Sequence, residues 1–286
     1  MNIKDFVHSV KCSRMQFSPS DVLRPYVKNY TLISIDKDLT DEVFYPSGYI
    51  DLVINVSEGN AITFIDGRRR KLPGVEVLGH LTLPSRLTVT KGTSVLIARI
   101  YPFASSLFFT DSMSEFTNYA TDAYGIFSKE INHFYYSLME AGSLEQKIAV
   151  LDRFLVGKLI KNEKQHRKSK LIGQVCKHIY SMGDTYNSKT LSSGYGLSER
   201  YLEKLFVNMV GISPRALFSV HRFNKSLDLV LSSARKLTSI AYDCGYHDQS
   251  HFIKEFTKFT GITPFEARST LSTNGEEFQQ AVNIGF

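Results

Sequence analysis

Residues 245–264 read GYHDQSHFIKEFTKFTGITP, and this stretch decides how the second half of the chain folds. Its aromatic residues Phe252, Phe256 and Phe259 recur at the spacing of one buried helical stripe, which predicts a helix over about 248–260. The glycine and the Thr-Pro pair that follow are typical of a helix end and of the start of the next helix. The first turn of the predicted helix is polar, and a helix whose only task is to pack needs no such turn.

The same pattern stands fifty positions earlier in the chain. Leu202, Phe206, Met209, Gly211, Ile212 and Pro214 correspond one by one to Phe252, Phe256, Phe259, Gly261, Ile262 and Pro264. Each copy follows a short apolar segment and a glycine turn, which let two helices cross closely. The repeat therefore predicts two helix-turn-helix units, whose second helices lie at about 198–209 and 248–260. A helix from about Pro214 to Ser232 is expected to join them.

The net charge of the chain, +6, is concentrated in this repeated region. Between Lys168 and Arg268 there are 14 Lys and Arg against 8 Asp and Glu, a surplus equal to that of the whole chain. Such an asymmetry favours a module that binds a polyanion, attached to a neutral domain. The three cysteines stand far apart, which suits a reducing compartment, and no run of about 18 apolar residues predicts a membrane span.

The first hundred residues predict short β-strands. In YIDLVINV, residues 49–56, apolar and polar residues alternate, and turn formers separate it from AITFI, VEVLGHLTL, RLTVT and SVLIARIY. From about residue 103 the pattern becomes helical. The expected fold class is α+β, with a small β-barrel domain and its helices over 1–165, an all-α domain over 171–270 and a tail over 271–286. The charged segment 161–170 is the predicted boundary.

An apolar stripe follows the predicted strands. Leu144, Ile148, Leu151, Leu155 and Leu159 fall along one side of a predicted helix. This stripe can pack either on the chain's own barrel or on a second copy of the chain. The second alternative motivates the prediction of a homodimer through the N-terminal half.

The polar turn that opens the helix at 248–260 has a functional interpretation. At 100° per residue, Ser250 and Lys254 lie almost opposite the aromatic stripe, with Gln249 and His251 on its flanks. A helix that buries aromatic residues and exposes a polar N-terminal tip has the layout of a recognition helix in the major groove of DNA. The alternative is a solvated polar face of a helical bundle, which explains one unit but not two matching units in the basic region.

Longer stretches of this region resemble a known family. AYDCGYHDQSHFIKEFTKFTGITPFEAR resembles the signature of the AraC/XylS family of bacterial transcription regulators, and LSERYLEKLFVNMVGISPRALFSVHRFNKSL resembles its first unit and linker helix. The resemblance covers about residues 171–270. More loosely, YPSGYIDLVINV and IARIYP resemble the cupin-like sensor half of one branch, which binds an effector or supports dimerisation. By position, the resemblance implies DNA contacts from Arg200, Glu203, Lys204, Gln249, Ser250, His251 and Lys254.

Two departures from the family pattern concern affinity. Glu199 and Glu203 place two acids on the first recognition helix, where phosphates repel them unless Glu203 accepts a hydrogen bond from cytosine. Thr257 and Lys258 stand where the family usually has two basic residues. Neither departure changes the expected fold or class, but both lower the expected nonspecific affinity for DNA.

Other polar residues have weaker functional interpretations. Candidates for an effector pocket, all on predicted β segments, are Asp51, Asn55, His80, Arg99 and Tyr101. His247 and His251 have the spacing of metal ligands, with Asp248 between them, but no further ligand is recognisable nearby. No metal and no cofactor are therefore predicted. RRRK, residues 68–71, follows an Asp-Gly turn and is expected in a solvated hairpin.

The predicted function is a cytoplasmic, sequence-specific transcription regulator rather than an enzyme. Its expected partners are double-stranded promoter DNA, RNA polymerase and a small-molecule effector, with activation assumed and the operator left open. One alternative is an enzyme, of the repair or cupin type, with an appended DNA-binding domain. That chemistry needs clustered ligands or a nucleophile, whereas Cys12 stands alone in the N-terminal half and His80 in the barrel. A module that no longer binds DNA is a third alternative.

Overall fold

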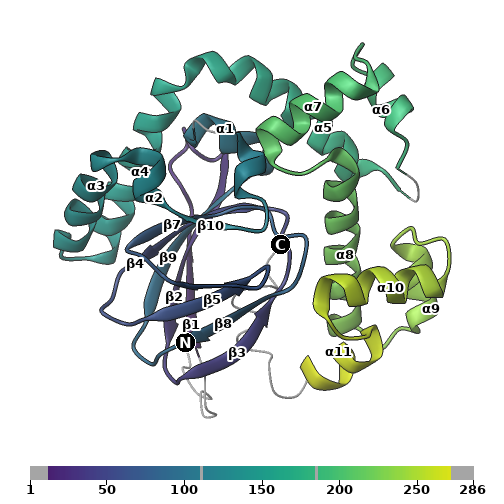
Figure 1. Cartoon of the computed structure of the whole chain (residues 1–286), viewed down its shortest axis with the longest axis horizontal. Coiled ribbons are helices and arrows are strands. Elements are labelled where there is room, and N and C mark those ends of the chain that lie inside the picture. The colour runs from purple at the N-terminus through teal and green to yellow at the C-terminus, as the bar shows by residue number, and fades with distance from the viewer. Residues whose placement is uncertain (1–11, 110–111, 184–185, 272–286) are drawn as a thin grey trace, which may run out of the picture.

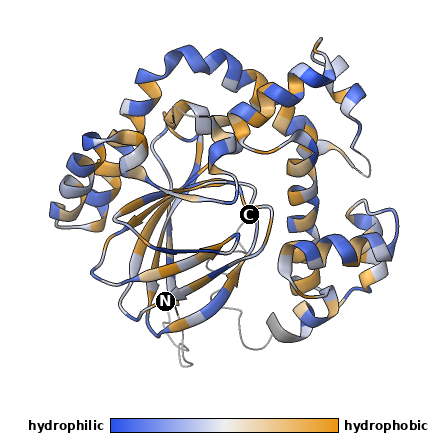
Figure 2. Ribbon diagram, viewed as in Figure 1, coloured by the Kyte–Doolittle hydropathy of each residue, from blue (hydrophilic) through white to orange (hydrophobic). Residues whose placement is uncertain are grey.

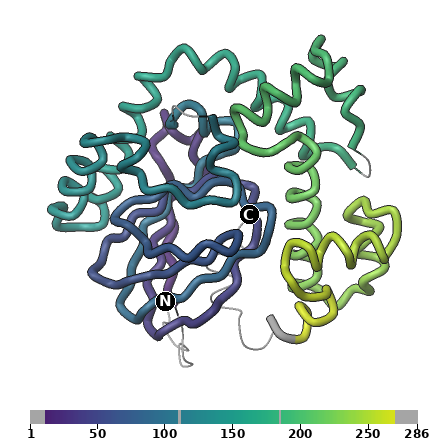
Figure 3. The backbone as a smooth tube through the Cα atoms, in the orientation of Figure 1, coloured from purple at the N-terminus to yellow at the C-terminus, as the bar shows by residue number. Residues whose placement is uncertain are grey.

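The computed structural model describes residues 12–109, 112–183 and 186–271, and its two halves lie side by side (Figure 1). The N-terminal half is rich in β-strands and the C-terminal half is helical, as the sequence predicts. Figure 3 traces the chain from the strands through a long helix, α4 (Leu144–Lys161), into the helical half. In the described residues, no helix is long and apolar enough to span a membrane.

Two antiparallel sheets face each other in the N-terminal half. One sheet has the order β1-β2-β9-β4-β7-β10 and the other β3-β8-β5-β6. The strands are β1 Cys12–Phe17, β2 Val27–Ile35, β3 Leu39–Phe44, β4 Ile50–Asn55, β5 Ala61–Ile65, β6 Arg68–Lys71, β7 Val75–Leu78, β8 Ser85–Val89, β9 Ser94–Ile100 and β10 Ala120–Asp122.

Strand β4 shows how the larger sheet is buried on both faces. Ile50, Leu52 and Ile54 are fully buried in a core that they share with the helices of the N-terminal half. Asp51 and Val53 point the other way and line a cavity between the two sheets. The predicted alternation is confirmed, but its polar side faces the interior of the sandwich rather than solvent.

The hairpin between β5 and β6 follows from its turn. Asp66 and Gly67 both have positive φ, +49° and +72°, which is the geometry of a two-residue type I′ turn and favours an Asp-Gly pair. The turn sets the register in which Ile65 pairs with Arg68. Three of the four residues of RRRK are exposed on β6, so the predicted solvated hairpin is confirmed.

The helices of the N-terminal half cover the outer face of the larger sheet. They are η1 Pro102–Ala104, α1 Ser105–Phe108, η2 Met113–Phe116, α2 Ala123–Phe127, α3 Lys129–Glu140 and α4. The apolar stripe of α4 packs into the chain's own core, where Leu151 and Leu155 are at most 1% exposed. The stripe therefore gives no support to the predicted dimer interface.

The helical half contains the predicted repeat. Its elements are η3 Glu163–Gln165, α5 His166–Ser181, α6 Ser188–Ser193, α7 Glu199–Val210, α8 Pro214–Ser232, α9 Leu237–Asp243, α10 Gln249–Thr260 and α11 Pro264–Leu271. Helix α8 has the bounds predicted for the linker, and its hydrophobic and hydrophilic residues alternate along its length (Figure 2). Helix α11 begins with a capping box, because the side chains of Glu266 and Thr263 each accept a hydrogen bond from the other residue's backbone N–H, at 2.7 and 3.2 Å.

The two halves are joined by hydrogen bonds as well as by the chain. Ser105 Oγ donates to the Met209 carbonyl at 3.0 Å, and Thr117 Oγ1 donates to the Gly211 carbonyl at 2.7 Å. The charged segment 161–170 is helical, since it contains η3 and the first turn of α5. Its charges suit solvated helix faces as well as a linker, so the boundary stays a prediction.

The two glycines that end α7 and α10 provide a matched test of this contact between the halves. Gly211 has φ +101° and Gly261 has φ +80°, so a side chain is strained at both. A Cβ on Gly211 would also lie 2.7 Å from the Met113 carbonyl oxygen, whereas one on Gly261 would meet nothing within 4 Å. We expect Gly261→Ala to cost about 1–2 kcal/mol of stability and Gly211→Ala to cost clearly more. Denaturant unfolding measures both, and equal losses would contradict the close approach.

Candidate nucleic-acid interface and barrel cavity

The two candidate recognition helices, α7 and α10, begin and end in the same way. Ser198 caps α7 and Asp248 caps α10, each accepting a hydrogen bond from the backbone N–H three residues later. Leu202, Phe206 and Met209 are at most 2% exposed, and so are the corresponding Phe252, Phe256 and Phe259. The buried stripes fix which face of each helix remains outside.

The outer face of α10 carries the residues predicted from its polar tip. Ser250, His251 and Lys254 are exposed, and Gln249 is partly exposed. His251 packs edge-on against Tyr246 at 5.4 Å between ring centroids, so its ring is positioned rather than free to swing. The capping carboxylate of Asp248 also lies 3.1 Å from His247 Nδ1. The structure therefore brings the four predicted contact residues together at one end of one helix.

The outer face of α7 is more mixed in charge. Arg200, Glu203 and Lys204 are all exposed, as the recognition-helix interpretation requires. They line a groove together with Ser112 and Ser114 of the N-terminal half. Helix η2, which contains Ser114, belongs to the β-rich half and contacts α7. The β-rich half therefore lies against one side of the first unit.

Glu199, the other acid of the first recognition helix, has a structural partner. Its carboxylate accepts a hydrogen bond from Ser188 Oγ, in the first turn of α6. This contact ties the two helices of the first unit together at their N-terminal ends. It gives Glu199 a packing role beside any effect that its charge has on DNA.

A buried ion pair holds α10 against α8, and sequence reasoning missed it. Arg222 Nη2 donates to both carboxylate oxygens of Glu255 at 2.8 and 2.7 Å, and its Nη1 donates to the Gly245 carbonyl at 3.2 Å. The side chains are 10% and 14% exposed. The guanidinium also lies 4.3 Å from the Tyr246 ring centroid. The acid on α10 is thus neutralised internally, which leaves no uncompensated negative charge beside Lys254.

The five effector candidates do not gather at one site. Asp51 and Arg99 line the cavity between the sheets, but Asn55, His80 and Tyr101 are not among its lining residues. Asn55 instead holds the turn after β4, because its Nδ2 donates to the Gly59 carbonyl at 3.0 Å. Burial lowers the pKa of His80 to about 3, so this ring is neutral. Tyr101 stacks on Phe103 at 5.6 Å between ring centroids.

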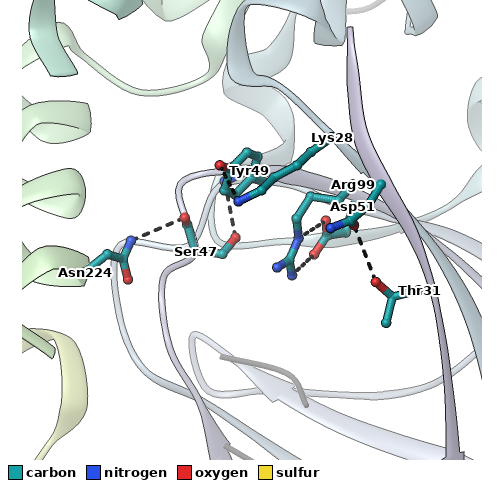
Figure 4. Close-up of polar contacts among 8 residues, drawn as sticks. Lys28, Thr31, Ser47, Tyr49, Asp51, Arg99 and Asn224 are labelled. Atoms are coloured by element: carbon teal, nitrogen blue, oxygen red, sulfur yellow. Dashed lines mark hydrogen bonds and ion pairs between the residues drawn. The ribbon is translucent and has the colours of Figure 1, made fainter. Parts of the chain in front are cut away.

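Asp51 and Arg99 form a two-pronged ion pair across adjacent strands (Figure 4). Arg99 Nε and Nη2 donate to the two Asp51 carboxylate oxygens, both at 3.0 Å. Burial lowers the pKa of the Arg99 guanidinium, but the charge and hydrogen bonds of Asp51 outweigh burial, so the pKa lies above its usual value. Nearby, burial and the charge of Arg99 lower the pKa of Lys28 to about 8, and Lys28 Nζ donates to Tyr49 Oη at 3.1 Å. This end of the cavity is polar and ordered.

The cavity is also lined by residues that the sequence analysis did not select as candidates. Tyr45 and Ser47 line it from the loop between β3 and β4, and Thr63 and Glu76 line it from β5 and β7. Glu76 lies opposite Val53 in the pairing of β4 and β7. An acid inside VEVL, a strand-like apolar run, is the signal that could have identified it.

Breaking the ion pair of α8 and α10 should destabilise the second unit. Arg222→Met leaves the Glu255 carboxylate buried without its partner, so we expect a loss of about 3–5 kcal/mol in denaturant unfolding. Arg235→Met, which removes the exposed Arg235–Asp243 pair of the same unit, should cost at most about 1 kcal/mol. The double variant Arg222→Met, Glu255→Leu should regain much of the loss. Similar losses in the two single variants would show that the pair does not hold α10.

Two family models match the chain. A model described as a helix-turn-helix domain matches residues 191–270, and one described as a domain of unknown function, DUF6597, matches residues 15–122. Among solved structures, ToxT of Vibrio cholerae is 14% identical over 84% of this chain and 97% of that chain, with a TM-score of 0.47. The C-terminal domain of AraT from Geobacillus stearothermophilus is 25% identical over 35% and 84%, with a TM-score of 0.34.

Curated relatives match the helical half. The virulence regulon transcriptional activator VirF of Yersinia enterocolitica is 33% identical over 82 residues, which are 28% of this chain and 30% of that protein. The regulator ExsA of Pseudomonas aeruginosa is 31% identical over 77 residues, 27% of this chain and 28% of that protein. The chain thus matches less than a third of the length of these relatives. This chain carries a DUF6597 domain in its N-terminal half, followed in sequence by an AraC-type helix-turn-helix domain in its C-terminal half.

Proposed function

We propose that this protein is a sequence-specific DNA-binding transcription regulator of the AraC type. The observation that carries the proposal is the repeat of one capped helix, α7 and α10, with the same buried stripe and an exposed polar N-terminal end. Both copies lie in the part of the chain that contains the whole surplus of positive charge. The match of residues 191–270 to the helix-turn-helix family supports it independently.

The linker helix has a length that suits two contacts on one face of DNA. Helix α8 has 19 residues, which corresponds to about 28 Å at 1.5 Å per residue. Successive major-groove segments on one face of the duplex are about 34 Å apart. A rigid spacer of this length lets α7 and α10 occupy neighbouring segments.

The exposed side chains have the chemistry of base and phosphate contacts. Gln249 can bond adenine with two hydrogen bonds, and Arg200 can do the same to guanine. Ser250, His251 and Lys204 can reach base edges or phosphate, and Lys254 lies where a backbone contact is expected. Glu203 accepts hydrogen bonds only, so its base partner would be cytosine.

The remaining roles are part of the same proposal. The cavity between the sheets, with Asp51 and Arg99 in its lining, is the proposed effector site. Promoter DNA and RNA polymerase are the proposed macromolecular partners, in the cytoplasm. The relatives VirF and ExsA are regulators rather than enzymes, which supports a role without catalysis for this chain. The enzyme alternative has no specific observation in its favour.

Three substitutions should separate the roles of the two helices. Lys254→Ala should weaken binding to all duplexes alike and lower the salt slope by about one unit, because it removes a phosphate contact. Arg200→Ala should relax the sequence preference at one base position, with a loss of about 1–3 kcal/mol in the binding free energy that discriminates between bases there. Glu203→Ala should raise nonspecific affinity, because it removes a charge that repels phosphate. Titrations on specific and random duplexes at several salt concentrations measure all three effects.

The specific duplex is first obtained by selecting genomic fragments that the protein binds. Lys177→Ala is the matched control, since Lys177 is an exposed lysine of the same basic half that lies on α5, outside both recognition helices. It should lower affinity less than Lys254→Ala does. If all three variants bind like the parent protein, then α7 and α10 do not enter the major groove and the proposed function is wrong.

A further inference from the structure

The space between the two sheets is a small, mainly apolar cavity. Its volume is about 120 Å³, and side chains such as Ile33, Leu72, Val89 and Ile97 form most of its wall. An apolar cavity of about 150 Å³ in another protein stays dry and binds benzene. This cavity is thus the size of one six-membered ring or a compact aliphatic group.

The cavity lining includes buried polar atoms on both sheets, among them Thr63 Oγ1 on the smaller sheet and Glu76 Oε2 on the larger sheet. These two atoms have no hydrogen-bond partner among the described residues. The residues are 7% and 3% exposed. A buried polar atom without a partner costs about 1–3 kcal/mol, so such atoms in a native protein usually mark a place where water or a ligand supplies the missing bond.

We propose that this cavity binds a compact hydrocarbon that carries a hydroxyl group, an alcohol or a phenol, and that the loop Tyr45–Tyr49 transmits its presence to α8. The apolar wall accommodates the hydrocarbon, and the hydroxyl bonds Thr63 and Glu76. The inference deepens the proposed function by naming the class of effector and its route to the DNA-binding half. Its binding step does not depend on DNA.

A hydroxyl group fits the chemistry of Glu76 better than other polar groups do. Burial raises the pKa of Glu76 to about 7, with a smaller opposite effect of Arg70 and a further increase from Asp122. Near neutral pH the carboxyl group is thus present in both forms. A hydroxyl can donate to the carboxylate and accept from the carboxylic acid. A ligand carboxylate placed against Glu76 and Thr63 would meet the charge of Glu76, and a bare hydrocarbon would leave both atoms unpartnered.

The loop between β3 and β4 connects the cavity to the linker helix. Tyr45 and Ser47 line the cavity, and on the other side of the same loop they contact α8. Tyr45 packs edge-on against Phe223, with 6.4 Å between ring centroids, and the Ser47 carbonyl accepts a hydrogen bond from Asn224 Nδ2 at 3.2 Å. The loop also approaches α8 at Gly48, where an added Cβ would lie 3.4 Å from Val220 Cγ1. Figure 4 shows Asn224 of α8 beside this loop.

The loop is also tied to the ordered polar end of the cavity. Tyr49, its last residue, accepts from Lys28 and lies with its ring 5.5 Å from the Arg99 guanidinium (Figure 4). The Tyr49 backbone N–H donates to Ser47 Oγ at 3.2 Å, which makes the loop a compact turn. A ligand that presses on Tyr45 or Ser47 therefore moves groups that touch α8, because Tyr49 fixes the other end.

Binding is tested on the full chain with three probes that share one ring. Phenol carries the hydroxyl, benzene lacks it and benzoate replaces it with a carboxylate. We expect saturable phenol binding by calorimetry, about tenfold tighter than benzene, which corresponds to one hydrogen-bonded buried group. Benzoate should bind more weakly than phenol. Thr63→Val and Glu76→Leu should each reduce the preference for phenol over benzene, whereas Thr121→Val, on β10 outside the cavity lining, should not change it.

Several results would overturn the binding step. They are the absence of saturable phenol binding, benzoate or benzene binding as tightly as phenol, or a phenol preference that survives both Thr63→Val and Glu76→Leu. Should Glu76→Leu fail to fold, Thr63→Val decides the question, because it replaces a hydroxyl by a methyl group at nearly constant volume.

Transmission is tested by hydrogen exchange in α8, which needs no DNA. Saturating phenol should change the exchange of amides around residues 220–224 in the parent protein. Asn224→Ala, which removes the bond to Ser47, should abolish that change without abolishing phenol binding. Asn208→Ala is the matched control, because Asn208 Nδ2 bonds Ser112 Oγ of the N-terminal half at 3.0 Å but lies on α7.

An unchanged response in Asn224→Ala, or no response in the parent protein, would overturn the route through the loop. A protein that shows both effects yet binds no DNA would refute the proposed function alone.

Discussion

The packing of helix α8 is the constraint on which the rest of the structure depends. Its N-terminal turns place Leu217 and Phe218 in the core of the first helix-turn-helix unit. Its later turns place Phe223 and Leu227 in the core of the second unit, and Tyr45 of the β-rich half packs into that same core. One helix thus contributes to the hydrophobic core of both units and contacts the sandwich. Because α8 packs against α7 in one core and against α10 in the other, it holds these two helices in a defined relation to each other and to the cavity.

The features that sequence could predict are those encoded by neighbouring residues. The bounds of α7 and α10 follow from an N-cap residue, a stripe at helical spacing and a glycine with positive φ, all within about a dozen positions. The polar faces of α7 and α10 follow from the same geometry, since the aromatic stripe fixes the opposite side. The family to which residues 191–270 belong follows in turn, because its signature consists of these local elements.

The features that sequence could not predict depend on residues far apart in the chain. Asp51 and Asn55 share one face of β4, yet only Asp51 lines the cavity, because Asn55 lies at the strand end and bonds its own turn. The stripe of α4 is the same whether it packs on a second copy or on the larger sheet, and only the tertiary structure shows the latter. The pairing of Arg222 with Glu255 spans 33 positions, and no local pattern marks either residue as a partner of the other.

The two helix-turn-helix units are attached to the β-rich half in different ways, and in the proposed route this asymmetry decides which unit responds to the cavity. The first unit is fixed by backbone carbonyls: Met209 and Gly211 accept hydrogen bonds from Ser105 and Thr117, and Ser105 is fully buried. None of these four residues lines the cavity. The second unit meets the β-rich half through Tyr45 and its neighbours, which do line it. A change at Tyr45 or Ser47 therefore reaches α8 at Phe223 and Asn224, where the helix packs in the core of the second unit. In the proposed function α7 and α10 enter two groove segments at once, so a small rotation of α8 would alter their combined fit to DNA.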